Sequence, residues 1–139
     1  YMGRISGPLL DRIDIHVDVP AVRYRDLSDA RRGESSEVVR ERVIKARERQ
    51  RTRFSERKDL FKNADMLASD IRMWCSLDTS SSDLLNKAMN SLGLSARAYD
   101  RILKVSRTIA DLADSEHIKV EHVSEAVQYR SLDRQFWNG

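Results

Sequence analysis

The sequence predicts a mainly α-helical fold, a helical bundle preceded by one β-strand. Residues 93–114 carry apolar side chains at the three- and four-residue spacing of a long amphipathic helix. Aromatic residues make up 6% of the chain, and Gly and Pro number 5 and 2, a composition that argues against a turn-rich β-sandwich or barrel. Apolar and polar residues alternate over residues 13–19, and no other segment alternates as regularly. This pattern is typical of a single half-buried strand.

Composition excludes several classes of protein. The 139 residues suffice for one ordinary domain with a real core. A net charge of +3 does not mark a nucleic-acid-binding protein, so any such signal has to be local. No apolar run is long enough to span a membrane, and no secretory signal opens the chain. The single cysteine, Cys75, excludes an internal disulfide; it is expected to be a small buried side chain in a reducing compartment, which predicts a cytoplasmic protein.

The expected strand predicts that the chain is a fragment of a longer protein. Its apolar residues are Ile13, Ile15, Val17 and Val19. A lone strand cannot satisfy its own backbone hydrogen-bonding groups, so its sheet is expected to lie outside this chain. The first residue, Tyr1 rather than Met, points the same way. We therefore divide the chain into residues 1–33, the end of another domain with a connector, and residues 34–139, a helical domain.

A second long helix is predicted from Ser35 to about Phe54, and it is strongly basic. Its faces carry seven Arg and Lys residues around a thin apolar stripe. They favour either a solvated helix with intrahelical ion pairs or a surface that contacts nucleic-acid phosphates. The first interpretation is favoured because no aromatic residues are interleaved with the charges. The candidates for nucleic-acid contact are Arg40, Arg47 and Arg51.

Three shorter elements complete the bundle. Helices are predicted over Met66–Trp74, Ser81–Leu92 with an acidic cap at Asp78, and Val120–Arg130. In the long helix of residues 93–114, Ser95 is the expected N-cap. The predicted core-facing stripe consists of Ala98, Ile102, Val105, Ile109 and Leu112, with Asp111 on the solvent side.

Two arginines stand in suggestive positions. Arg97 falls in the first turn of its helix, where the helix dipole disfavours a cation unless an anion such as phosphate docks there. The alternative is an ordinary solvated arginine. Arg12 directly precedes the expected strand, and its alternative role is a local ion pair with Asp11 or Asp14.

Other chemistry is not indicated by the sequence. There is no phosphate-cradling G-x-x-x-x-G-K-[ST] loop, no G-x-S-x-G elbow and no C-x-x-C pair. The spacing of the three histidines does not favour zinc, so no metal site is predicted. The chain by itself looks catalytically incomplete.

Four segments together resemble the C-terminal part of magnesium-chelatase-like AAA+ ATPases, and within them the subgroup of competence proteins. They are Arg4–His16 (RISGPLLDRIDIH), Gly93–Tyr99 (GLSARAY), Arg107–Leu112 (RTIADL) and Gln128–Arg130 (QYR). The resemblance covers essentially the whole chain. It implies that residues 13–19 are the last strand of an AAA+ core and that the helices from Ser35 onward form the lid of that ATPase.

The resemblance also implies roles for the two arginines. Arg12 matches the arginine finger that reaches into the nucleotide site of a neighbouring subunit, and Arg97 matches the sensor-2 arginine that contacts the γ-phosphate of ATP. ATP and Mg²⁺ are then cofactors of the full-length protein. The Walker motifs expected upstream are missing here, so the fragment is expected to bind no cofactor and to be inactive alone. The implied partners are other subunits of the same ring, which is expected to be a hexamer, and DNA. No membrane partner is expected.

Three functions remain open at this point. The first is the lid fragment of a ring-forming ATPase that remodels DNA, as the competence-protein subgroup is associated with DNA transformation. The second is a stand-alone basic helical module that binds nucleic acid or an acidic protein. The third is a motor subunit of a metal chelatase that serves metal insertion into porphyrin.

Overall fold

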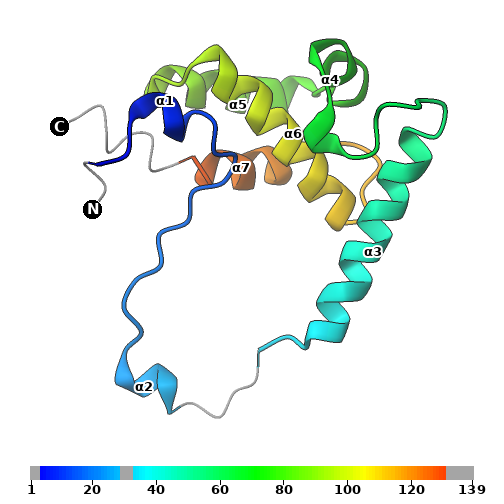
Figure 1. Ribbon diagram of the computed structural model, residues 1–139. Coiled ribbons are helices and arrows are strands. Elements are labelled where there is room, and N and C mark those ends of the chain that lie inside the picture. Colours follow the sequence, from blue (N-terminus) through cyan, green and yellow to red (C-terminus); the bar gives the residue numbers. More distant parts are fainter. Residues whose placement is uncertain (1–3, 29–32, 131–139) are drawn as a thin grey trace.

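The computed structural model describes residues 4–28 and 33–130, which form helices and no β-strand (Figure 1). This confirms the mainly α-helical fold class. The elements are α1 (Gly7–Leu10), α2 (Tyr24–Leu27), α3 (Ser36–Arg53), the 3₁₀ helix η2 (Asn63–Asp65), α4 (Ala68–Trp74), α5 (Thr79–Leu92), α6 (Ala96–Leu112) and α7 (Val120–Gln128). The four predicted helices from residue 35 onward appear as α3, α4, α5 and α7, around the long helix α6. The short α1, α2 and η2 were not predicted.

The strand expected over residues 13–19 is not formed in this chain. The exposed fraction of its apolar residues rises from 40% at Ile13 to 80% at Val19. In Figure 1 this segment is part of the open blue loop that leads from α1 to α2. The alternating pattern describes a face that could be buried, but a strand also requires a hydrogen-bonded neighbour. No other described segment supplies that neighbour.

Helix α6 is the centre of the bundle. It contacts α3, α4, η2 and α7, and α5 packs against α7. One hydrophobic core joins these elements. It consists of Phe54, Leu60, Met66, Ile71, Cys75, Leu85, Ile102, Leu103, Ala110, Ile118, Val123 and Ala126. The crossing of these helices around α6 is therefore maintained by burial of apolar side chains from α4, α5, α6 and α7 and from the segments between them.

The helix ends follow local chemistry. Ser35, Asp78 and Ser95 are N-caps, each accepting the backbone N–H three residues later at 3.3, 2.8 and 3.2 Å. These hydrogen bonds satisfy amides that have no partner within a helix. Helix α5 ends at Gly93 in the left-handed region, with φ of 60°, which glycine adopts without a Cβ clash. The tight corner at Gly93 sets where α6 begins.

The buried face of α6 is broader and more polar than its apolar stripe predicts. Asp111 was expected on the solvent side, but it is only 1% exposed, and Arg107 is buried beside it. The reason is that α3 covers this side of α6 and brings arginines to it, so a carboxylate can be buried here together with its counter-charges.

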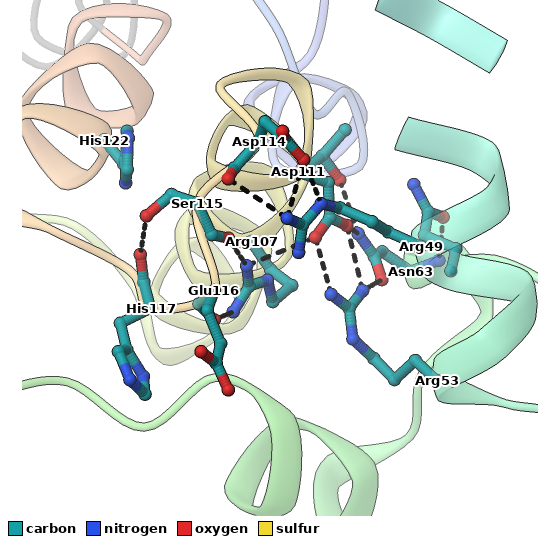
Figure 2. A network of polar contacts seen from close by, with 12 residues as sticks. Arg49, Arg53, Asn63, Arg107, Asp111, Asp114, Ser115, Glu116, His117 and His122 are labelled. Carbon is teal, nitrogen blue, oxygen red and sulfur yellow. Dashed lines mark hydrogen bonds and ion pairs between the residues drawn. The ribbon is translucent and has the colours of Figure 1, made fainter. Parts of the chain in front are cut away.

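The carboxylate of Asp111 is the centre of a buried polar network (Figure 2). Arg53 from α3 forms a bidentate pair with it, with Nη2 to Oδ1 at 2.5 Å and Nη1 to Oδ2 at 2.9 Å. Arg107 approaches Oδ1 at 3.2 Å, and the Asn63 amide donates to Oδ2 at 2.9 Å. The network therefore joins α3, η2 and α6 at one carboxylate.

Arg107 extends this network beyond the end of α6. Its two Nη groups donate to the carbonyl oxygens of Ser115 and Glu116 at 2.8 and 2.9 Å. Burial lowers the pKa of Arg107, an effect that the neighbouring Asp111 opposes. Nearby, Arg49 of α3 donates from Nε to the Asp114 carboxylate at 2.8 Å. Arginines of α3 are thus hydrogen-bonded to both the last turn of α6 and the turn that follows.

Replacing Asp111 by Asn should be strongly destabilising. The substitution keeps the side-chain volume but leaves Arg53 and Arg107 without their buried counter-charge, which typically costs about 3–5 kcal/mol. Urea denaturation of the chain measures the loss in free energy of unfolding. The matched control is Asp100→Asn on the exposed side of the same helix, which should change stability by less than about 0.5 kcal/mol. Equal effects of the two substitutions would contradict the central role of this network.

The thiol of Cys75 should be protected from alkylation in the folded chain. Burial raises its pKa to about 11 from an ordinary value of 9.0, because the thiolate is poorly solvated in the core. Since the thiolate is the reactive form, about 100-fold less of it is present at pH 8 than for an ordinary thiol. Iodoacetamide labelling followed by mass spectrometry should be at least about 100-fold slower in buffer than in 8 M urea. Comparable rates would show that the core around Cys75 opens readily.

Candidate functional site

Arg97 lies in the first turn of α6 with its side chain exposed. Ser95 takes the N–H of Ala98, so the amides of Ala96 and Arg97 have no acceptor among the described residues. The guanidinium of Arg97 has no ion-pair partner in the same part of the chain either. A helix start with free amides and a free arginine can receive an anion such as a phosphate group.

Arg12 is also exposed, but the chain around it is anchored to the bundle. The backbone N–H of His16 donates to the Tyr129 carbonyl at 2.7 Å, and its ring Nε2 donates to the Leu10 carbonyl at 3.2 Å. Arg130 donates to the carbonyl of Ile13. Arg12 itself forms no ion pair within the described ranges, so the alternative of a pair with Asp11 or Asp14 is not realised there.

An ion pair joins the segments that carry the two arginines. Asp14, two residues after Arg12, pairs with Arg101, one helical turn after Arg97. The structure therefore brings both segments to the N-terminal half of α6 but gives no contact between the Arg12 and Arg97 side chains. The Asp111 network lies at the other end of α6, about 20 Å away for 14 residues of helix.

The basic residues of α3 fall into two groups. Arg42, Arg49 and Arg53 are paired with Glu34, Asp114 and Asp111. The sequence candidates Arg40, Arg47 and Arg51 are all exposed and have no ion-pair partner in the parts of the chain that the structure describes. Spacings of seven and four residues place these three on one face of α3, separate from the arginines that fasten α3 to α6.

The structure adds an aromatic residue that the sequence reading missed. Arg47 and Arg51 line a groove of about 680 Å³ together with Phe61, from the loop that follows α3. Phe61 is 71% exposed, although it follows the buried Leu60 directly. It lies ten residues or more from the arginines in sequence, so a search for aromatics within the basic helix does not find it. The sequence feature that could have identified Phe61 is the apolar pair Leu60-Phe61 within a polar loop.

The described ranges contain no cluster of side chains suited to bind a metal ion. No three His, Cys, Asp or Glu side chains come close enough there to hold an ion. His122 is used structurally, since its Nδ1 accepts the backbone N–H of Lys119 at 3.0 Å. Within the same ranges, no helix has the length and apolar character needed to cross a membrane.

Comparison with known families gives two adjoining matches. Residues 33–130 match the family described as magnesium chelatase, subunit ChlI C-terminal. Residues 1–27 match the family described as magnesium chelatase, subunit ChlI. Together the two matches include both Arg12 and Arg97.

Curated relatives agree with this assignment. The chain is 44% identical over 135 residues to the competence protein ComM of Haemophilus influenzae, covering 96% of this chain and 26% of that protein. It is 43% identical over 135 residues to the uncharacterized protein YifB of Escherichia coli, with the same coverage. An uncharacterized protein of Mycobacterium bovis is 35% identical over 131 residues, covering 94% and 25%. The chain therefore spans about a quarter of the length of these relatives.

The anchoring of the Arg12 segment can be tested by hydrogen exchange. Arg130→Gln removes the donor to the Ile13 carbonyl, so the amide of His16 should exchange about 10-fold faster, the effect of one hydrogen bond to a charged group. Mass-spectrometric or NMR exchange of His16 is compared with that of Val123 in the core. Arg72→Gln, at an exposed arginine of α4, is the control. Equal acceleration at both amides would mean that Arg130 supports the whole fold rather than this anchor.

Proposed function

Because this chain belongs to the magnesium chelatase ChlI family, in its ComM/YifB-type branch, we propose that it is the C-terminal lid region of a ring-forming AAA+ ATPase. Residues 34–139 constitute the helical lid, and residues 1–33 are the end of the ATPase core with its connector. The relatives are about four times as long as the matched region, which leaves room for the nucleotide-binding core. The alternating segment of residues 13–19 finds its partner strand in that core.

In this proposal Arg97 is the sensor-2 arginine. Its free guanidinium and the free amides of the same helical turn are the observation that carries the proposal, since they fit the γ-phosphate of ATP. ATP supplies the phosphoryl group that is transferred to water. Arg97 binds the terminal phosphate in the nucleotide site of its own subunit and couples the position of the lid to the presence of that phosphate.

Arg12 is the arginine finger and acts on the neighbouring subunit. It projects from a segment anchored on both sides, by the buried side chain of Leu10 and by the hydrogen bond from His16 to Tyr129, so its position is defined without an ion pair of its own. A planar, permanently charged fork of this kind stabilises negative charge on the phosphoryl group during transfer. Its action across a subunit boundary makes hydrolysis depend on ring assembly.

The proposed ring is a cytoplasmic homohexamer that remodels DNA and uses ATP with Mg²⁺. DNA is favoured as the substrate because a relative bears the name competence protein. We assign no Mg²⁺ ligand to this chain, whose described residues group no suitable carboxylates. The description of the matching family instead favours a second candidate, the motor subunit of a metal chelatase. Stimulation of the full-length ATPase by DNA or by a porphyrin-binding protein separates the two.

The arginine roles are tested in the full-length protein. Arg12→Ala should lower kcat for ATP hydrolysis by about 10³–10⁵, the range known for arginine fingers. Arg97→Ala should lower kcat by about 10- to 100-fold, for the loss of one charge-assisted hydrogen bond to phosphate. Arg72→Ala, an exposed arginine on α4, is the control and should hydrolyse ATP at the parental rate. Parental rates in either of the first two variants would refute the role assigned to that residue.

Mixed rings distinguish action on the neighbour from action within a subunit. A subunit that cannot bind ATP, through loss of its core phosphate-loop lysine, still offers a normal Arg12. Mixing it with Arg12→Ala subunits should restore activity at interfaces where the intact finger meets an intact site. Mixing it with Arg97→Ala subunits should restore none, since no site is then complete. The opposite pattern would reverse the two assignments.

A further inference from the structure

The groove between α3 and the loop of residues 55–64 combines positive charge with an exposed aromatic ring. Its lining includes four cationic side chains and no Asp or Glu among the described residues. Two other large grooves each include three acidic residues. One contains Asp14, Glu34 and Glu125, and the other contains Glu48, Asp114 and Glu116. Charge complementarity therefore favours an anionic occupant for this groove.

The four cations of the groove differ in how strongly they are paired within the chain. Arg57 is paired with Asp59 at 3.1 Å and with Asp70 at 2.7 Å. Lys62 lies 4.0 Å from Asp65, an exposed pair that solvent screens. Arg47 and Arg51 have no partner in the described part of the chain. They lie four residues apart, on successive turns of one helix face, a rise of about 6 Å.

The loop that carries Phe61 is held in place before any ligand arrives. The side chain of Gln50 accepts the backbone N–H of Asn63 at 2.9 Å. The Asn63 amide in turn donates to Thr108 at 3.1 Å and to Asp111 at 2.9 Å. Leu60, which directly precedes Phe61 in the chain, is buried. Because Leu60 and Asn63 are fixed on either side of Phe61, its exposed ring can bind a planar group at little cost in conformational entropy.

We propose that this groove binds single-stranded DNA, with a base stacked on Phe61 and phosphates contacted by Arg47 and Arg51. This inference rests on the proposed DNA-remodelling function and names the form of DNA that the lid takes. A positively charged groove with an aromatic platform is the arrangement that binds single strands without sequence preference. Duplex DNA does not fit as well, because its base faces are stacked within the helix. Arg40 lies one heptad before Arg47 on the same face and extends the phosphate path.

The stacking contact is tested with fluorescein-labelled oligo(dT), by fluorescence anisotropy, on the 139-residue chain and on the full-length protein. Phe61→Ala should weaken binding by about 5- to 150-fold. Phe61→Tyr keeps an aromatic face and should bind as the parent does. Met73→Ala, an equally exposed apolar residue outside the groove, should leave binding unchanged. An oligomer of abasic sites supplies phosphates without bases, so Phe61→Ala should not affect its binding.

The phosphate contacts are tested by salt dependence. Arg47→Gln and Arg51→Gln should each reduce the slope of log K against log salt by about 0.7, the value for one phosphate of a single strand. Arg72→Gln, at an exposed arginine outside the groove, should leave the slope unchanged. Parental slopes in both groove variants would remove Arg47 and Arg51 from the interface.

Three results would overturn the proposal. They are equal affinity of the Phe61→Ala variant for oligo(dT), tighter binding of duplex than of single strand, and a change in ring assembly rather than in DNA affinity on replacement of Phe61. The last would make the groove a contact between subunits. Failure here is distinguishable from failure of the proposed ATPase role, because that role is judged by kcat of the Arg12 and Arg97 variants, not by oligonucleotide affinity.

Discussion

The carboxylate of Asp111 is buried beneath α3 and is balanced by Arg53 and Arg107. A single charge in this position would be costly to bury, and each guanidinium would be costly without it. The three groups therefore constrain one another, and through them α3, η2 and α6 have one favourable arrangement. The hydrophobic core alone would allow α3 to slide along α6, since the apolar stripe of α3 is thin. Polar specificity rather than apolar area sets the docking of the basic helix.

Helix α6 separates the two surfaces for which roles are proposed. At its C-terminal end it holds α3 and the loop with Phe61, through Asp111, Asn63 and Thr108. Toward its N-terminal end it carries Arg97 and, through Arg101 and Asp14, the segment with Arg12. One continuous helix thus connects the proposed phosphate site at Arg97 with the proposed DNA groove at Phe61.

The arginines of the described residues fall into two groups. Arg53, Arg107 and Arg130 are largely buried and engaged with carboxylate or carbonyl groups within the chain. Arg12, Arg47, Arg51 and Arg97 are exposed, and the described residues offer them no counter-charge. Sequence composition treats all of these alike, because each contributes one positive charge to a nearly balanced total. Sorting them by partner separates the cations that stabilise the fold from those that can meet an external anion.

The sequence by itself determined the α-helices from residue 35 onward, the N-caps Ser35, Asp78 and Ser95, and the resemblance to the family. These depend on spacing within a few residues and on local hydrogen bonds, such as those of Ser95 and Asp78. Tertiary structure decided the rest. Asp111 is predicted to face solvent from the sequence because its partner Arg53 is 58 positions away. Residues 13–19 are predicted to form a strand because alternation carries no information about whether a neighbouring strand is present. Phe61 joins the basic face of α3 only when the loop folds back, where Asn63 is hydrogen-bonded to Gln50, Thr108 and Asp111. The local sequence pattern indicates which side chains are favourable to bury or to pair. Only the packed chain determines which partners they have.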